Sequence, residues 1–140
     1  MKKLLLWSFT SLVGLAISTS IAFASHEVTP FLNNKKAALS ITLDDGYLSQ
    51  ITHGVPLLNA RNLKGTFFLI TDWISSTGGI TWDQWRQVAE QGHEIGSHSL
   101  SHPDLNELSD SELRRQLSES QKAIEMNIPS QSCVSFCYPY

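Results

Sequence analysis

The sequence of 140 residues has little cysteine, no block of basic residues and one long apolar run. Its two cysteines are Cys133 and Cys137. If both lie on one strand, their Cα atoms are about 13 Å apart, too far for a disulfide, so we expect free thiols. Nothing in their spacing resembles a disulfide framework or a zinc ribbon.

The charge pattern argues against two classes of partner. The formal net charge is −3, and it becomes −5 if Lys2 and Lys3 are removed with the N-terminal segment. Without a basic block, neither nucleic acid nor an anionic membrane surface is a suitable partner.

Several catalytic and nucleotide-binding motifs are missing as well. No glycine-rich phosphate fingerprint follows a strand, and there is no G-x-S-x-G motif to support a nucleophilic triad. The zinc-protease motif also fails, because His93 and His98 of "HEIGSH" are five positions apart and Gly96 disfavours a helix.

The apolar run lies at the N-terminus, from Leu4 through Ile17, after two lysines and before the small residues Ala22-Phe23-Ala24. This is the pattern of a secretory signal peptide with an A-x-A cleavage site. The alternative is a membrane anchor, but the run is short for a span of about 20 residues. We therefore expect a signal peptide at 1–24, a lead-in segment at 25–36, export to the periplasm or the cell exterior, and no stable membrane span after cleavage.

Strands and helices alternate along the rest of the chain. Apolar runs and alternation predict strands at 37–43, 66–70, 93–97 and 133–137. Amphipathic spacing predicts helices at 52–62 and 81–91, and a third that begins at Ser109 and ends before Pro129. The order indicates an α/β protein with parallel strands, either an open doubly wound sheet or a (β/α) barrel.

Polar residues follow three of these strands. Asp44 and Asp45 end the first, His98 and His102 follow the third, and Tyr138-Pro139-Tyr140 follows the fourth. Since functional residues of parallel α/β folds lie just past the carboxyl ends of strands, we expect these groups to meet at one rim.

Two imidazoles and one carboxylate would make a three-ligand metal site with an open position for water, the pattern of catalytic zinc. The second carboxylate could then take a proton from that water. A structural alternative exists, because Asp-Asp-Gly is common in turns. Among the tryptophans, Trp82 and Trp85 have helical spacing and are better candidates for the core, whereas Trp73 is a candidate substrate contact.

Four segments, in order, resemble the polysaccharide deacetylases, the NodB-like domain of carbohydrate esterase family 4: "SITLDDGY", "KGTFFLI", "GHEIGSHSLSHPDL" and "FCYPY". The resemblance covers 37–140. It implies an irregular (β/α) barrel, of which the sequence holds the first four strands and three helices, incomplete at the C-terminus.

The resemblance also implies roles for individual residues. Asp44 would be the catalytic base, and Asp45, His98 and His102 the ligands of a divalent metal, most commonly Zn²⁺, with Co²⁺ or Ni²⁺ as alternatives. The Tyr140 amide would stabilise the oxyanion, and Pro139 with Tyr140 would line the substrate groove. Cys137 stands where the family often has arginine, so the route by which an arginine tunes the base is absent.

The leading expectation is therefore a metal-dependent hydrolase that removes acetyl groups from an acetylated polysaccharide or oligosaccharide, at nitrogen or oxygen. An alternative is a truncated metal- or glycan-binding remnant, because the family's later strands carry a general-acid histidine after this motif. A third is hydrolysis of cyclic amides, which the predicted signal peptide disfavours. The incomplete barrel is also expected to leave an exposed sheet edge.

Overall fold

The computed structural model describes residues 31–74 and 80–140. The predicted signal peptide at 1–24 and the first part of the lead-in segment lie outside the described residues. The chain divides into two units, 1–37 and 38–140. In the described part of the first unit, a 3-10 helix spans Leu32–Asn34. The predicted site belongs to the second unit.

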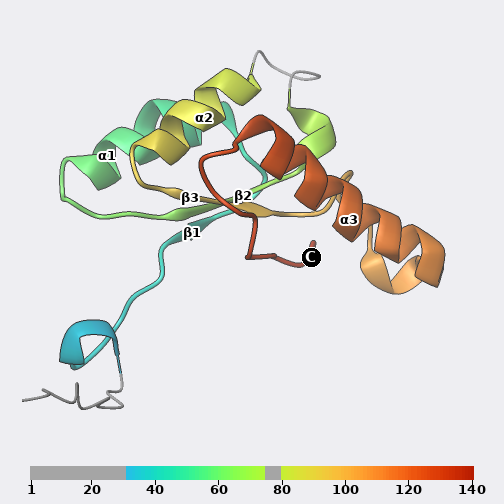
Figure 1. The fold of residues 1–140 in the computed structure, drawn as a ribbon, viewed down its shortest axis with the longest axis horizontal. Helices are drawn as coiled ribbons and strands as arrows, with labels where there is room; N and C mark the ends of the chain where they lie inside the picture. Colours follow the sequence, from blue (N-terminus) through green and yellow to red (C-terminus); the bar gives the residue numbers. More distant parts are fainter. Residues whose placement is uncertain (1–30, 75–79) are drawn as a thin grey trace, which may run out of the picture. The chain divides into compact units, whose positions relative to one another are not determined.

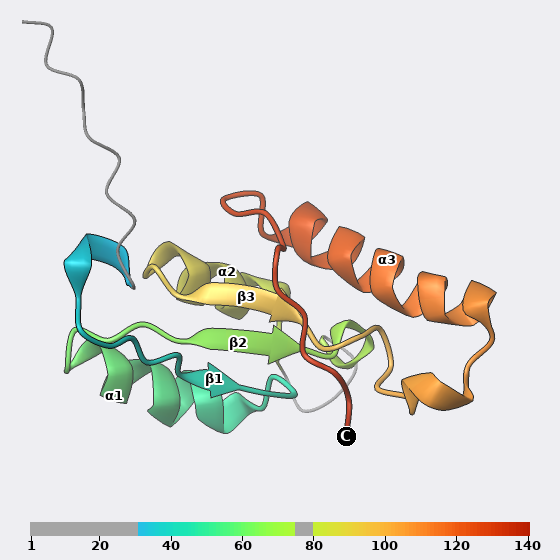
Figure 2. The ribbon, with the colours of Figure 1, turned by 90° about the horizontal axis from the view of Figure 1, so that it is seen from below.

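The second unit is built on a parallel sheet of three strands: β1 (Thr42–Leu43), β2 (Thr66–Leu69) and β3 (Glu94–Ser97). Their order in the sheet is β1-β2-β3, the same as their order in the chain (Figure 2). Helices α1 (Val55–Asn59) and α2 (Trp82–Glu90) cover one face of the sheet (Figure 1). Sequential order with these helices on one face is the arrangement of a barrel arc, not of a doubly wound sheet.

Two predicted strands are shorter than expected. The first spans only Thr42–Leu43 instead of 37–43, because the residues before Ile41 have no strand partner and are exposed. The fourth, predicted at 133–137, is reduced to a single parallel bridge between Ser97 and Phe136. In that bridge the Ser97 N–H donates to the Ser135 carbonyl, and the Cys137 N–H donates to the Ser97 carbonyl. Ser97 is also the last residue of β3.

The first helix begins earlier than predicted and is irregular. Helical structure starts at residue 48, and a π-helical turn, η2 (Gln50–Gly54), precedes α1. Pro56 lies in the first turn of α1, directly after the π-helical turn. Because proline has no N–H to donate to the carbonyl four residues earlier, a π turn beside it relieves the mismatch.

The residue types Thr81 and Gln84 predict a capping box at the start of α2, and the structure confirms it: the Thr81 hydroxyl accepts from the Gln84 N–H, and the Gln84 side chain accepts from the Thr81 N–H. Its inward face buries Trp85 completely and Trp82 partly, which confirms them as core residues. The β2 side chains Phe67 and Leu69 are fully buried in the same core, and Phe68 on the opposite face is only 8% exposed, as expected for a strand covered on both faces.

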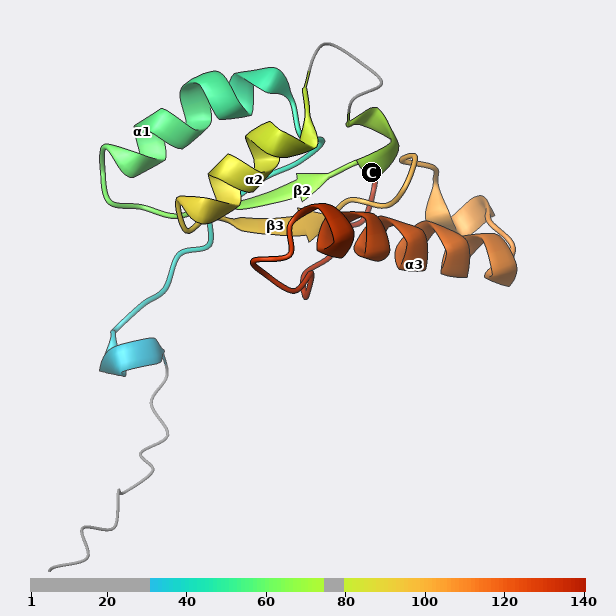
Figure 3. The same ribbon diagram turned by 45° about the horizontal axis from the view of Figure 1, so that its top comes forward.

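Helix α3 (Asp110–Asn127) runs beside β3 (Figure 3). Its N-cap is Ser109, as predicted. Its sequence predicts an apolar stripe of Leu113, Leu117, Ile124 and Ile128, but only Ile124 and Ile128 are buried, and Leu117 is 37% exposed. Two polar residues of α3, Gln116 and Ser120, are buried as well.

Candidate metal centre

Three predicted ligands come together at the carboxyl ends of β1 and β3. One Asp45 carboxylate oxygen lies 3.4 Å from His98 Nε2 and 3.6 Å from His102 Nε2. The two imidazole Nε2 atoms are 3.2 Å apart. Within the described parts of the chain, these residues form the one cluster with spacing suited to a metal ion.

The surroundings of His98 leave its Nε2 free to bind a cation. The ring is 3% exposed, and its Nδ1 lies 2.9 Å from the Cys137 carbonyl oxygen. A carbonyl can only accept, so Nδ1 carries the proton and Nε2 keeps its lone pair. This is the orientation that ligating histidines usually have, and three basic atoms converging on one point fit a divalent cation.

The aspartate turn is built to direct two neighbouring carboxylates differently. Asp45 has a φ of 75° and Gly46 a φ of 80°. A Cβ at Gly46 would lie 2.9 Å from the Leu69 side chain, so this close turn needs glycine. The Gln50 side-chain amide donates to the Asp44 carbonyl oxygen and fixes the start of the turn.

Positive φ values cluster at the candidate site. Apart from asparagines, the non-glycine residues with positive φ in the described chain are Asp45, Ser99, His102 and Tyr140. Positive φ is uncommon for non-glycine residues, least so for aspartate and histidine, and backbone strain of this kind concentrates at functional sites. The clustering is independent of the side-chain distances and indicates the same location.

Asp44, the predicted base, is exposed at the end of β1 and has a thiol as its neighbour. Burial, the negative charge of Asp44 and a hydrogen bond to its carboxylate raise the pKa of the Cys137 thiol. Cys137 therefore remains protonated near neutral pH and donates to Asp44 without contributing a positive charge. The other thiol, Cys133, is buried, which raises its pKa to about 11.

Aromatic side chains border the site. The Tyr140 ring centroid lies 4.8 Å from that of His102, and the Trp73 centroid lies 6.1 Å from it, in the 3-10 helix η3 (Thr71–Trp73) that follows β2. Pro139 is buried, so its ring is not presented to solvent. Sequence reasoning missed Tyr47, whose phenol lies beside Asp45; the charge of that carboxylate raises the pKa of Tyr47.

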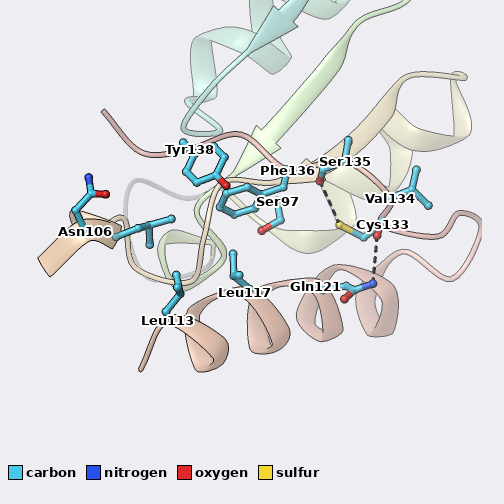
Figure 4. Close-up of a pocket in the computed structure, with 11 residues that line it drawn as sticks. Ser97, Asn106, Leu113, Leu117, Gln121, Cys133, Val134, Ser135, Phe136 and Tyr138 are labelled. Atoms are coloured by element: carbon cyan, nitrogen blue, oxygen red, sulfur yellow. Dashed lines mark hydrogen bonds between the residues drawn. The ribbon is translucent and has the colours of Figure 1, made fainter. Parts of the chain in front are cut away.

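Two of the cavities in this unit bear on the candidate site, and one of the two includes a candidate ligand. A cavity of about 400 Å³ extends from Asp45 along apolar side chains that include Leu48, Trp73 and Ile74. A larger groove of about 690 Å³ lies between α3 and the 133–138 segment and is lined by Leu113, Leu117 and Phe136 (Figure 4). Asp45, His98 and His102 do not line that groove.

Two other histidines of the described chain do not belong to the candidate metal centre. His93 is buried at the start of β3, where its Nδ1 accepts from the Gly65 N–H, and His53 is exposed on η2. Among the described residues, no helix has both the length and the apolar character needed to cross a bilayer.

Comparison with known proteins places these observations in a family. The polysaccharide deacetylase family model matches residues 32–140. A peptidoglycan-N-acetylglucosamine deacetylase of Listeria monocytogenes is 37% identical over 99 residues, which cover 70% of this chain and 20% of that protein.

Solved structures agree with the sequence match. A Streptococcus pyogenes deacetylase in complex with acetate superposes with a TM-score of 0.70 at 23% identity, over 76% of this chain and 49% of that one. A CE4 family pseudoenzyme from Bacillus anthracis matches with a TM-score of 0.63 at 25% identity, over 71% and 34%. The chain thus spans a fifth of the Listeria protein and up to half of these structures, and it belongs to the polysaccharide deacetylase family.

Proposed function

We propose that this chain carries the metal-binding part of a hydrolase that removes acetyl groups from an acetylated polysaccharide or oligosaccharide. The observation that supports the proposal best is the convergence of Asp45, His98 and His102 within 3.6 Å of one another, with the exposed carboxylate of Asp44 adjacent in sequence. The family match and the deacetylases among the relatives support the reaction type.

Asp45, His98 and His102 would hold the ion, with Zn²⁺ as the best match for two imidazoles and one carboxylate, and Co²⁺ or Ni²⁺ as alternatives. When bound, a divalent cation supplies Lewis acidity that lowers the pKa of a water and polarises the acetyl carbonyl. The Cys137 carbonyl, as acceptor for His98 Nδ1–H, holds that ring in its ligating orientation.

The remaining steps fall to the chain's own groups. The Asp44 carboxylate takes the proton from the attacking water, and its position at the end of β1 leaves it accessible to solvent and substrate. The backbone N–H of Tyr140 donates to the oxygen on which negative charge develops. A sugar ring would pack against Trp73 and Tyr140, whose rings flank His102, and the buried Pro139 would support the Tyr140 backbone.

Acetate release tests the proposal. The purified, zinc-loaded protein is incubated with chitin oligosaccharides, peptidoglycan and acetylated xylan, with and without EDTA. We expect EDTA to abolish release, and Asp44→Asn to lower it by about 10²–10⁴-fold while zinc stays bound. The control is Asp83→Asn, which removes an exposed carboxylate on α2 far along the chain from the site. Release that is unaffected by both EDTA and Asp44→Asn would refute the proposal.

A second candidate function is metal or glycan binding without catalysis. Two observations favour it: a thiol, Cys137, stands beside Asp44 where family members often carry arginine, and a CE4 pseudoenzyme is among the structural neighbours. Zinc bound at one equivalent, with no acetate released from any of the three substrates, would select this alternative.

Export remains part of the proposal, because residues 1–24 have the composition of a signal peptide. The expected mature N-terminus is Ser25, in the periplasm or the medium. Mass spectrometry of the protein recovered from each cell fraction tests this, and an intact Met1 terminus would contradict it.

A further inference from the structure

The turn that carries His98 and His102 has unusual backbone geometry, with φ values of 70° at Ser99 and 64° at His102. It is neither helix nor strand, so its N–H groups need partners from elsewhere. His98 donates to the Leu69 carbonyl of β2, and His102 donates to the Ser99 hydroxyl inside the turn. The N–H groups of Leu100 and Ser101, in the middle of the turn, have no such acceptor in β2 or in the turn itself.

Helix α3 supplies the missing acceptor through one side chain. Gln116 Oε1 accepts from the N–H of Leu100 and from the N–H of Ser101, both at 3.0 Å. Its Nε2 donates to the Ser101 hydroxyl at 2.9 Å and to a Glu112 carboxylate oxygen at 3.1 Å. The amide thus makes four hydrogen bonds, three of them to the short segment between the two histidines.

These bonds fix the orientation of the amide. A carbonyl oxygen is required opposite two N–H donors, and an NH₂ group is required opposite the Glu112 carboxylate, so the side chain has one satisfactory position. Gln116 is only 2% exposed and Leu100 is 8% exposed, so the loss of this acceptor would leave the buried Leu100 N–H unsatisfied, whereas Ser101 is exposed and could turn to water.

We propose that Gln116 is a positioning residue for the metal centre: it acts from α3, touches no ligand, and holds the His98–His102 turn in the conformation that brings both imidazoles to Asp45. The inference rests on the proposed function, because it assumes that these three residues bind a metal.

Zinc affinity and stability, measured separately, test this role. Isothermal titration calorimetry gives the Zn²⁺ dissociation constant of the purified protein and its variants, and urea denaturation gives the unfolding midpoint of each metal-free form. Gln116→Met removes all four hydrogen bonds at similar volume. Ile124→Val is the control, because Ile124 lies on the same helix in the buried core cluster, which includes no residue of the 98–102 turn.

We expect Gln116→Met to weaken zinc binding by about 10-fold or more, the usual cost of losing a residue that orients metal ligands. Ile124→Val should lower the unfolding midpoint and leave zinc affinity unchanged. Gln116→Glu combined with Glu112→Gln should restore much of the affinity, because the carboxylate still accepts from both N–H groups and the new amide at 112 can donate to it.

The outcomes separate the two hypotheses. If the unmodified protein and Gln116→Met bind zinc equally well, the positioning role is wrong and the metal centre stands. The role is also wrong if Gln116→Met and Ile124→Val weaken binding in proportion to their loss of stability, because that pattern indicates core packing alone. If the unmodified protein binds no zinc, the proposed metal centre fails, and the role of Gln116 fails with it.

Discussion

At the scale of single residues, the backbone of the Asp44-Asp45-Gly46 turn bears on the two different roles that we propose for its carboxylates. Asp44 follows β1 directly and is exposed, whereas Asp45 has a φ of 75° and its carboxylate lies 3.4 Å from His98 Nε2. Neighbouring residues of identical type can thus serve as base and ligand. The distinction depends on Gly46, where any larger residue would meet the Leu69 side chain.

His93 is a residue whose contribution to stability depends on pH. Its burial, and then the nearby Lys64 charge, lower its pKa from the ordinary value of 6.5. The unfolded chain therefore binds a proton more readily than the folded one. The contribution of His93 to stability is fully present above pH 6.5, the ordinary pKa of histidine in the unfolded chain. It is lost as the pH falls through the lower pKa of the folded state.

We expect the urea midpoint of the unmodified protein to decrease when the pH is lowered from 7.5 to 5. His93→Gln should remove part of that pH dependence. The comparison isolates His93, because His98 and His102 are present in both proteins. Glu112, whose pKa is lowered to about 2 by hydrogen bonds from Arg115 and Gln116, affects stability only below about pH 4.5. Identical pH profiles for the two proteins would contradict the prediction.

At the scale of elements, β3 and the 133–137 segment approach so closely that only glycine fits between them. A Cβ on Gly96 would lie 2.5 Å from the Ser135 hydroxyl and 2.6 Å from the Phe68 ring. The bridge from Ser97 to Phe136, which brings the Cys137 carbonyl to His98, depends on this approach.

Gly96→Ala is therefore expected to lower the free energy of unfolding by about 1–3 kcal/mol, the usual cost of overpacking. Gly54→Ala is the matched control: Gly54 has helical φ and ψ of −61° and −54°, and its added Cβ would meet only Leu43 at 3.5 Å. That variant should gain about 0.5–1 kcal/mol. Chemical denaturation measures both, and equal effects of the two substitutions would disprove the steric argument.

Elements also show how far the sequence alone could lead. Residues that ended predicted strands were brought together as expected, because parallel strands place their carboxyl ends at one rim. The lengths of the strands could not be predicted from the sequence. Segments 37–41 and 133–137 have strand-like composition, but strand pairing depends on neighbouring segments that sequence patterns do not specify. Gln116 was missed because a polar residue on a helix is usually solvent-exposed, and only the fold shows it buried against the turn.

At the scale of the whole unit, the groove beside α3 leaves apolar surface open to solvent. Leu117 is 37% exposed there, and Leu113 and Phe136 line the same cavity of about 690 Å³. Exposed apolar surface of this kind promotes association between molecules.

We expect Leu117→Glu to reduce self-association of the purified protein, as measured by light scattering over a range of concentrations. Its stability should change by no more than about 0.5 kcal/mol, since the side chain is partly exposed. Leu57→Glu adds the same charge on α1, where Leu57 is 56% exposed and outside the groove. If both variants reduce association equally, net charge rather than the groove is responsible.

The position of the three proposed ligands, Asp45, His98 and His102, has a consequence for the stability of the sheet. Asp45 follows β1 and the two histidines follow β3, and these strands pair with β2 but not with each other. A cation held by all three would brace the sheet across its central strand and anchor the two-residue β1, its weakest member. Withdrawal of the ion would then loosen β1 first, and faster amide exchange at Thr42 and Leu43 would report that loosening before the core opens.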